Sequence, residues 1–263
     1  MVSYEAARHG EYDFGSYKRA FRQADLSGYD VVYLVNDSVV GPLRPLEPYL
    51  LRMEALGTDA FGLVLNPSRH GRHLQSWFIG LKPSVFRAPW FAEFLSGVEA
   101  LGRKEDVCIR YENGLARLLE AHSASYAGLW ELRGKAIYNA VGRLSRQGFP
   151  FLKKSAFTRH GGSLGPAVAR ALSQAKPSMA LAIVADLDRL YGEEYRRVFL
   201  SEAPCAPSAA ISAIFPASLR VDDQQSQGVP VHGRPGLEVD HHGPAFPRVD
   251  GESVAVPVDV EGI

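Results

Sequence analysis

The feature of this chain that most constrains its fold is an alternation of strand and helix patterns that begins near Asp13. Short apolar runs at 29–35, which is rich in β-branched residues, and at 60–65 alternate with amphipathic segments of helical length at 14–26 and 46–56. Such an alternation is typical of proteins in which helices connect and cover the strands of a sheet. We therefore predict an α/β fold with a largely parallel sheet and flanking helices.

The same patterns continue along the chain. We predict further strands at 73–81 and 106–110 and an extended segment at 148–153. Asp13 is predicted to be the N-cap of the helix at 14–26. Further helices are predicted at 89–101, 112–122, 126–147, 164–174 and 179–194.

The last part of the chain has a different composition. Residues 204–263 hold eight of the 17 prolines and only two aromatic residues, too few apolar side chains to order the segment alone. We expect a mostly flexible tail there, with one strand-like segment at 254–260. The predicted division is an α/β domain at 1–155, a helical extension at 156–203 and the tail.

Composition and charge exclude several classes of protein. No apolar run reaches the ~18 residues that a membrane-spanning helix needs, and the N-terminus lacks the apolar core of a signal peptide. The cysteines, Cys108 and Cys205, are too few for a zinc cluster and favour a reducing, cytoplasmic compartment. Residues 1–205 carry 26 basic and 21 acidic side chains, a net charge of +5. This charge suits an anionic small-molecule ligand, and we expect no nucleic-acid partner.

Four segments in a fixed order carry a resemblance to a known family. They are 13–18 (Asp-Phe-Gly-Ser-Tyr-Lys), 36–38 with 41–43 (Asn-Asp-Ser, Gly-Pro-Leu), 73–78 (His-Leu-Gln-Ser-Trp-Phe) and 148–153 (Gly-Phe-Pro-Phe-Leu-Lys). No single string is specific, but their collinear order over about residues 8–155 resembles the rhamnan synthesis protein F family. That family is associated with the assembly of bacterial cell-surface polysaccharides.

The resemblance implies a glycosyltransferase with an A-type, Rossmann-like fold. Such an enzyme moves rhamnose or a related sugar from a nucleoside-diphosphate donor to a cell-surface polysaccharide of the rhamnan or O-antigen type. Family members carry strand–helix units ahead of the segment at 13–18, where this chain has only about a dozen residues. We therefore expect a partial fold without the N-terminal nucleotide-binding unit. The alternatives are a catalytically incomplete glycan-assembly or glycan-binding subunit and a glycoside hydrolase with paired carboxylates.

The resemblance also implies partners and a location. The expected ligands are a nucleotide-sugar donor and a lipid-linked or growing glycan acceptor. Other polysaccharide-assembly proteins are expected partners. The expected location is the cytoplasm, with peripheral contact at the inner face of the plasma membrane.

Residues 36–38 follow the predicted strand at 29–35, and ligands of α/β sheets collect at the carboxyl ends of parallel strands. In A-type glycosyltransferases an acidic motif at this place holds a divalent metal against the donor diphosphate. The resemblance therefore implies that Asp37 binds Mg²⁺ or Mn²⁺. Asn36 and Ser38 are expected to contact the donor sugar or phosphate. The structural alternative is an Asx-turn that closes the strand.

Inverting sugar transfer needs a base near the acceptor hydroxyl. Glu112 is the first candidate, because it begins a predicted helix directly after a short strand, a placement similar to that of the base in many inverting A-type enzymes. Asp59 is the second candidate. The structural alternative for Glu112 is an acid in the first turn that interacts with the helix dipole.

Four further residues are candidates for substrate binding. His73 and Gln75 share one face of a predicted strand and are expected to contact the donor, with His73 completing a metal site beside Asp37. A satisfied polar residue is the structural alternative for each. Asp13 and Tyr17 lie four apart at a helix start and therefore share a face. N-capping is the alternative for Asp13.

Overall fold

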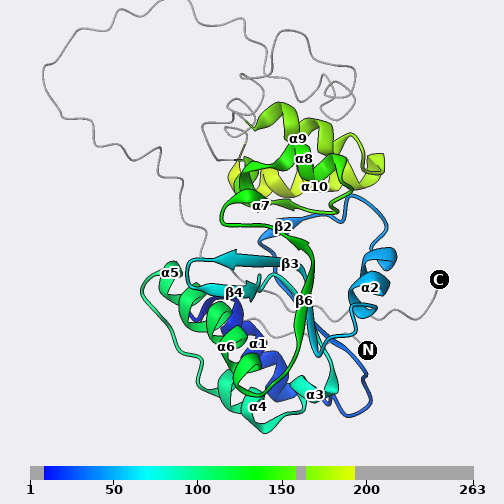
Figure 1. The fold of residues 1–263 in the computed structure, drawn as a ribbon. Coiled ribbons are helices and arrows are strands. Elements are labelled where there is room, and N and C mark those ends of the chain that lie inside the picture. Colours follow the sequence, from blue (N-terminus) through cyan, green and yellow to red (C-terminus); the bar gives the residue numbers. More distant parts are fainter. Residues whose placement is uncertain (1–8, 158–163, 193–263) are drawn as a thin grey trace, which may run out of the picture.

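The computed structural model describes residues 9–157 and 164–192 of the 263-residue chain. A five-stranded sheet forms its centre (Figure 1). The nine-residue strand β3 is the middle of this sheet and pairs with β4, β5 and β6, and β1 pairs with β5. The strands are β1 (Val32–Val35), β3 (Ala60–Ser68), β4 (Gly71–Leu74), β5 (Phe78–Leu81) and β6 (Tyr126–Glu131).

The sheet is mixed. Within the described residues, β3 and β6 run parallel, whereas the pairs β1/β5, β3/β5 and β3/β4 are antiparallel. The α/β class and the helices that flank the sheet are confirmed, and the prediction of a largely parallel sheet is corrected to a mixed one. The physical reason is local, because a tight turn at residues 69–70 returns the chain antiparallel to β3, with no crossover helix between.

Residues 75–77 interrupt the strand that was predicted at 73–81. Leu65 pairs with Leu74, and Gly62 pairs with Ile79, so two residues of β3 lie opposite four residues of the other strand. The segment 75–77 is therefore a bulge with two extra residues. Bulges of this kind turn side chains out of a regular sheet and are frequent beside active sites.

Two predicted elements have a different secondary structure from the one expected. The start of the helix predicted at 126–147 is strand β6, and only its later part is helical, as α7 (Ala136–Asn139) and α8 (Val141–Arg146). Gly128 makes this possible, since a Cβ atom there would lie 2.7 Å from the backbone nitrogen of Leu65 on β3. The strand predicted at 106–110 is helical instead: α5 (Lys104–Val107) continues into a π-helical turn, η1 (Cys108–Glu112).

The other predicted helices are present within a few residues of their expected bounds, and α3 is an additional short helix. Asp13 lies inside the first turn of α1, where Glu11 is the N-cap residue, so its prediction as the N-cap is wrong. The helices are α1 (Tyr12–Gln23), α2 (Glu47–Glu54), α3 (Pro83–Phe86), α4 (Pro89–Ser96), α6 (Asn113–Ala121), α9 (Gly165–Leu172) and α10 (Pro177–Tyr191).

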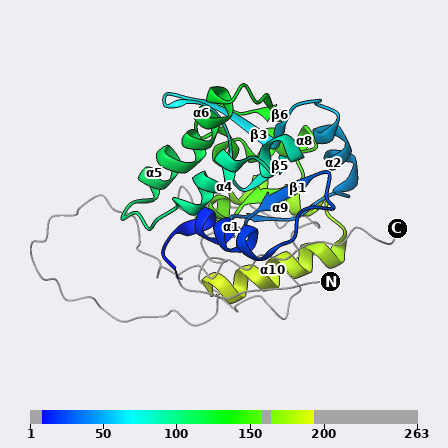
Figure 2. The ribbon, with the colours of Figure 1, turned by 90° about the horizontal axis from the view of Figure 1, so that it is seen from below.

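Helices pack on both faces of the sheet. On one face, α1, α4 and α6 bury apolar residues such as Phe14, Phe91 and Leu119 against the strands, and Figure 2 shows these three helices together on one side. On the other face, Met53 of α2 packs with Phe61 of β3 and with residues from α7 and α8. The sheet is thus the middle layer of the molecule.

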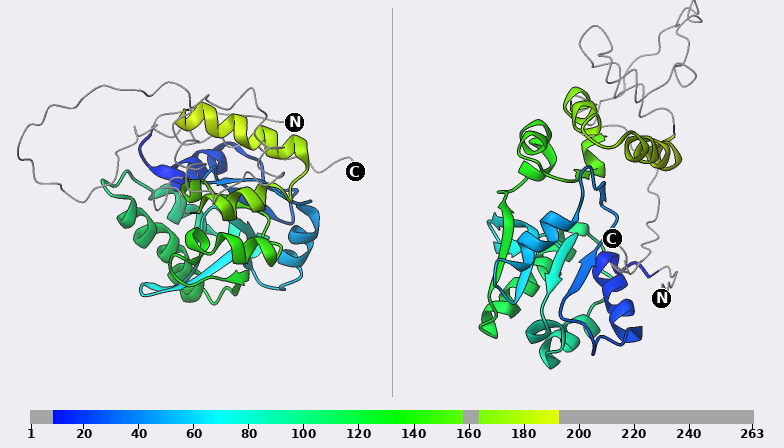
Figure 3. Two further views of the ribbon diagram at one scale, coloured as in Figure 1. Left: turned by 90° about the horizontal axis from the view of Figure 1, so that it is seen from above. Right: turned by 90° about the vertical axis from the view of Figure 1, so that its right-hand side faces the viewer.

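A third apolar cluster joins the last helices to the rest of the chain. Strands β2 (Val39–Val40) and β7 (Leu152–Lys153) form a two-stranded antiparallel sheet. Val40 and Leu152 pack with Val168 of α9 and Leu187 of α10. In the right-hand view of Figure 3, α8, α9 and α10, coloured green to yellow, gather at one end of the molecule.

Some expectations are not answered by this fold. The division of the chain at residue 155 stays a prediction. The predicted tail at 204–263, with its strand-like segment at 254–260, lies outside the described residues. Among the residues that the structure describes, no helix combines the length and the apolar character that crossing a membrane requires.

Candidate functional site

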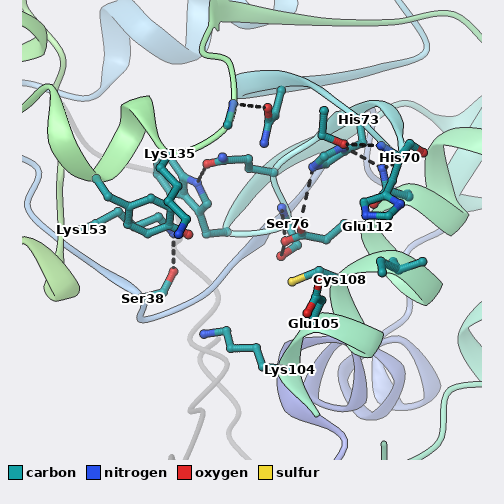
Figure 4. Close-up of a pocket in the computed structure, with 18 of the residues that line it drawn as sticks. Ser38, His70, His73, Ser76, Lys104, Glu105, Cys108, Glu112, Lys135 and Lys153 are labelled. Atoms are coloured by element: carbon teal, nitrogen blue, oxygen red, sulfur yellow. Dashed lines mark hydrogen bonds and ion pairs between the residues drawn. The ribbon is translucent and has the colours of Figure 1, made fainter. Parts of the chain in front are cut away.

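A cavity of about 1140 Å³ brings together segments that are far apart in the sequence (Figure 4). Its walls come from the start of α1, the loop after β1, the bulge at 75–77, the helices α5 and η1, and strand β7. Seven of the nine candidate site residues line this cavity. They are Asp13, Asn36, Asp37, Ser38, His73, Gln75 and Glu112.

Asp59 is not among the residues that line the cavity. It precedes the first residue of β3, whereas Asn66, Pro67 and Ser68 at the other end of this strand line the cavity. The Asp59 carboxylate accepts hydrogen bonds from Ser125 Oγ at 2.6 Å and from Ser84 Oγ at 2.8 Å. These hydrogen bonds from Ser125 and Ser84 lower its pKa. Asp59 thus connects the starts of β3, α3 and β6, away from the other candidates.

Tyr17 is not among the residues that line the cavity. The side chain is buried, and its hydroxyl donates a 2.9 Å hydrogen bond to the backbone oxygen of Ser76. Burial, together with the nearby Asp13 carboxylate, raises the pKa of Tyr17 well above its ordinary value. Tyr17 therefore attaches α1 to the bulge that carries Ser76.

Glu112 is held in a defined orientation at the cavity wall. Its Oε1 accepts hydrogen bonds from Ser76 Oγ at 2.5 Å and from Ser76 N at 3.2 Å. Its Oε2 lies 3.8 Å from His73 Nε2. Glu112 is the last residue of the π-helical turn, and such turns often occur at functional sites. The sequence indicated Glu112 but gave no sign of the π-helical turn.

His73 is fixed by a second partner. The ring is 5% exposed, and its Nδ1 lies 2.9 Å from Nδ2 of Asn113, the residue that follows Glu112. The same Nδ1 lies 3.1 Å from the backbone oxygen of Gly71, which can only accept, so the two contacts require different ring tautomers. With Asn113 as the donor, the ring proton is on Nε2 and faces Glu112. This arrangement makes His73 a partner of Glu112, and Asn113 is a buried polar residue that the sequence analysis did not single out.

The loop after β1 forms the predicted Asx-turn. Asn36 Oδ1 accepts hydrogen bonds from Ser38 N at 3.0 Å and from Ser38 Oγ at 2.6 Å. Gln75 lies in the bulge, and its side-chain oxygen accepts a 2.8 Å hydrogen bond from Trp77 Nε1. The structural alternative to ligand binding is thus present for both residues, and both still border the cavity.

Basic side chains form a wall that sequence reasoning missed. Lys104, Arg133, Lys135, Lys153 and Lys154 all line the cavity. Lys153 is 7% exposed, its Nζ donates a 2.8 Å hydrogen bond to Ser38 Oγ, and burial lowers its pKa to about 7. Lys153 is the last residue of the family-like segment at 148–153. Its place in that segment was the only feature of the sequence that could have indicated a role at the site.

Asp13 faces the same space as these lysines. Its pKa is raised to about 6, mainly by burial; the negative charges of Glu112 and Asp37 act in the same direction, and Lys104 and Lys153 oppose them. A carboxyl group that titrates close to neutral pH can exchange protons under physiological conditions.

The residues do not fit a resident divalent metal ion. The Asp37 carboxylate pairs with Lys154 Nζ at 3.0 Å, and the His73 ring is turned toward Glu112. Within the described ranges, no three His, Cys, Asp or Glu side chains come together as a metal site. Mg²⁺ usually binds proteins through one or two carboxylates together with waters and substrate phosphates, and the Asp37 carboxylate already pairs with an ammonium group.

The fold and the cavity define a class: an α/β protein whose mixed sheet borders a large cavity lined by both acidic and basic side chains. Comparison with protein families matches residues 6–188 of the chain to rhamnan synthesis protein F. The chain belongs to this family, which links it to the synthesis of rhamnan and related polysaccharides. The match confirms the resemblance seen in the four segments and extends it into α10. A search of curated proteins and a search of solved structures each find no match.

Proposed function

We propose that the chain is a glycosyltransferase that moves rhamnose or a related sugar from a nucleoside-diphosphate donor to a rhamnan or O-antigen type polysaccharide. The observation that carries the proposal is the pairing, in one cavity, of an oriented carboxylate with a wall of basic side chains. Glu112 is fixed by Ser76 and His73, and Lys104, Lys153 and Lys154 line the same space.

The volume of the cavity supports this proposal. Sites for small molecules usually enclose ~300–1,000 Å³, and this cavity measures about 1140 Å³. A donor and the end of a growing or lipid-linked glycan can therefore bind at the same time. The proposed location is the cytoplasm, at the inner face of the plasma membrane, where other polysaccharide-assembly proteins are the expected partners.

In the proposed reaction Glu112 is the base. The acceptor hydroxyl oxygen attacks the anomeric carbon, the bond from this carbon to the diphosphate oxygen breaks, and the diphosphate leaves with the electron pair. Glu112 takes the acceptor proton through Oε2, because Ser76 already occupies Oε1. Asp13 is one of the other carboxyl groups that line the cavity and is proposed to bind a sugar hydroxyl.

The test is a transfer assay with the full chain, a panel of nucleoside-diphosphate rhamnose donors and a lipid-linked glycan acceptor. We expect Glu112→Gln to lower the turnover by ~10²–10⁴-fold, the usual contribution of a general base. The amide oxygen of the new side chain can still accept from Ser76, so the variant is expected to fold. Glu47→Gln, the same change on the exposed side of α2, is the matched control. Wild-type turnover of Glu112→Gln would remove this residue from the mechanism.

One observation favours the alternative, a catalytically incomplete glycan-binding subunit. In the described part of the chain the central sheet has a single parallel strand pair, β3/β6, whereas nucleotide-binding halves are built from several consecutive parallel strands. Glycan binding without transfer from any donor would support this alternative. Release of free sugar from a glycan in the absence of a nucleotide would instead indicate hydrolysis.

A further inference from the structure

Lys153 is a buried amine that forms no ion pair in the described part of the chain, although the Glu112 and Asp13 carboxylates act on it from beyond ion-pair distance. Its Nζ contacts the Ser38 hydroxyl and lies 4.8 Å from the centre of the Trp77 ring. None of the ion pairs among the described residues includes it. Burying a cation without an anion is unfavourable, so a bound anion would complete this site.

Three more ammonium groups border the same space, those of Lys104, Lys135 and Lys154. Lys104 extends from α5, and Figure 4 shows it on the side of the cavity where Ser38 and Lys153 lie. Lys154 follows Lys153 directly and holds the Asp37 carboxylate. In proteins, phosphate oxygens accept hydrogen bonds from ammonium and hydroxyl groups such as these.

We propose that Lys104, Lys153 and Lys154 bind the diphosphate of the sugar donor and take the place of a divalent metal ion. This inference rests on the proposed function and specifies how the donor is held. Asp37 then positions Lys154, and the Ser38 hydroxyl positions Lys153. Negative charge increases on the diphosphate as its bond to the sugar breaks, and fixed ammonium groups stabilise this charge without reorganising.

The same side chains disfavour a metal ion at this place. The sequence-predicted ligand, Asp37, is within 3.0 Å of the Lys154 ammonium group, which would repel a divalent cation. The other predicted ligand, His73, has the Glu112 carboxylate as its neighbour. The diphosphate therefore meets cationic side chains where the family resemblance implied a metal.

The test uses inorganic pyrophosphate as the probe and titration calorimetry on the full chain. Pyrophosphate is expected to bind in the presence of EDTA, and added Mg²⁺ is expected not to tighten binding. Lys153→Met should weaken the affinity by at least tenfold and Lys104→Met by a few fold. Lys176→Met, an exposed lysine at the start of α10, is the control and should bind like the wild type.

Two results would overturn the inference: pyrophosphate binding only when Mg²⁺ is present, or unchanged binding by both Lys153→Met and Lys104→Met. A thermal melt of each variant checks that it is folded. Lys104 is exposed, so Lys104→Met is expected to fold and tests the site even if Lys153→Met does not fold. Metal-independent pyrophosphate binding without any sugar transfer would reject the proposed function and leave the lysine site standing. Sugar transfer combined with pyrophosphate binding that requires Mg²⁺ would support the proposed function and reject the lysine site.

Discussion

The Ser76 hydroxyl donates a 2.5 Å hydrogen bond to Glu112 Oε1, which joins the bulge at 75–77 to the end of the π-helical turn. The bond fixes one oxygen of the carboxylate, and the other oxygen lies 3.8 Å from His73 Nε2. Neither the bulge nor the π-helical turn is regular secondary structure, and each supplies one partner. The orientation of the proposed base therefore depends on two local irregularities that are far apart in the sequence.

Ser76→Ala removes this hydroxyl and keeps the backbone N–H that also donates to Glu112. We expect kcat of sugar transfer to fall about tenfold, the effect of ~1.4 kcal/mol on the barrier, with a small change in KM. The reason is that Glu112 loses its shorter hydrogen bond and samples other rotamers. Steady-state kinetics check this, with Ser173→Ala, an exposed serine after α9, as the control. An unchanged kcat would show that Ser76 does not orient the base.

Tyr17→Phe removes the buried hydrogen bond to the Ser76 backbone oxygen. An unsatisfied buried acceptor usually costs ~1–3 kcal/mol, and we expect a loss in this range in the free energy of unfolding, measured by urea denaturation. Tyr29→Phe is the matched control, because Tyr29 is 56% exposed. Equal stability of the two variants would contradict the structural role assigned to Tyr17.

Gly128→Ala places a methyl group 2.7 Å from Leu65 N, closer than two such atoms can approach. We expect β6 to shift away from β3 and the free energy of unfolding to fall by ~1–3 kcal/mol, as for other overpacked sites. Gly102→Ala is the control, because a Cβ there meets nothing within 4 Å. A Gly128→Ala protein as stable as the control would argue against the parallel pairing of β3 and β6.

Because the pKa of Asp13 is raised on folding, the free energy of unfolding should fall as the pH rises from 3.8 to about 6. Its pKa is raised from 3.8 to about 6 in the folded chain, so the folded state holds a proton that the unfolded state has lost between these values. Protonated Asp13 makes its full contribution to the free energy of unfolding below pH ~4. This contribution is lost as the pH rises through about 6.

Asp13→Asn should therefore match the wild type in stability near pH 4 and exceed it at pH 7. The expected difference at pH 7 is on the order of 1–2 kcal/mol, because part of the Asp13 side chain still reaches solvent. Urea denaturation at several pH values measures it. A constant difference between the two proteins from pH 4 to pH 7 would show that Asp13 is not responsible.

Much of the helical framework could be predicted from the sequence. Amphipathic patterns located α1, α2 and α6, because apolar residues that face a core repeat with the helical period. The order of the family-like segments brought Asn36 and His73 into one hypothesis, and the place of Glu112 at a predicted helix start added it to them. The structure places all three around one cavity.

The parts that could not be predicted depend on contacts between distant segments. Residues 126–131 have no strict alternation of apolar and polar residues, and their strand conformation comes from pairing with β3. The wall of basic side chains was missed because a lysine is usually a solvated surface residue. Only the fold shows that Lys153 is buried beside Ser38. Asp59 was grouped with the cavity residues because the sequence does not show at which end of β3 the cavity lies.

The bulge at 75–77 also limits how this protein can be stabilised. Removing two residues there would let β3 pair without interruption along its whole length and would give a more regular ladder. The same deletion would take away Gln75 and Ser76 or move them to the wrong face of the strand. A deletion at this one position would therefore make the sheet more regular and at the same time dismantle the proposed site.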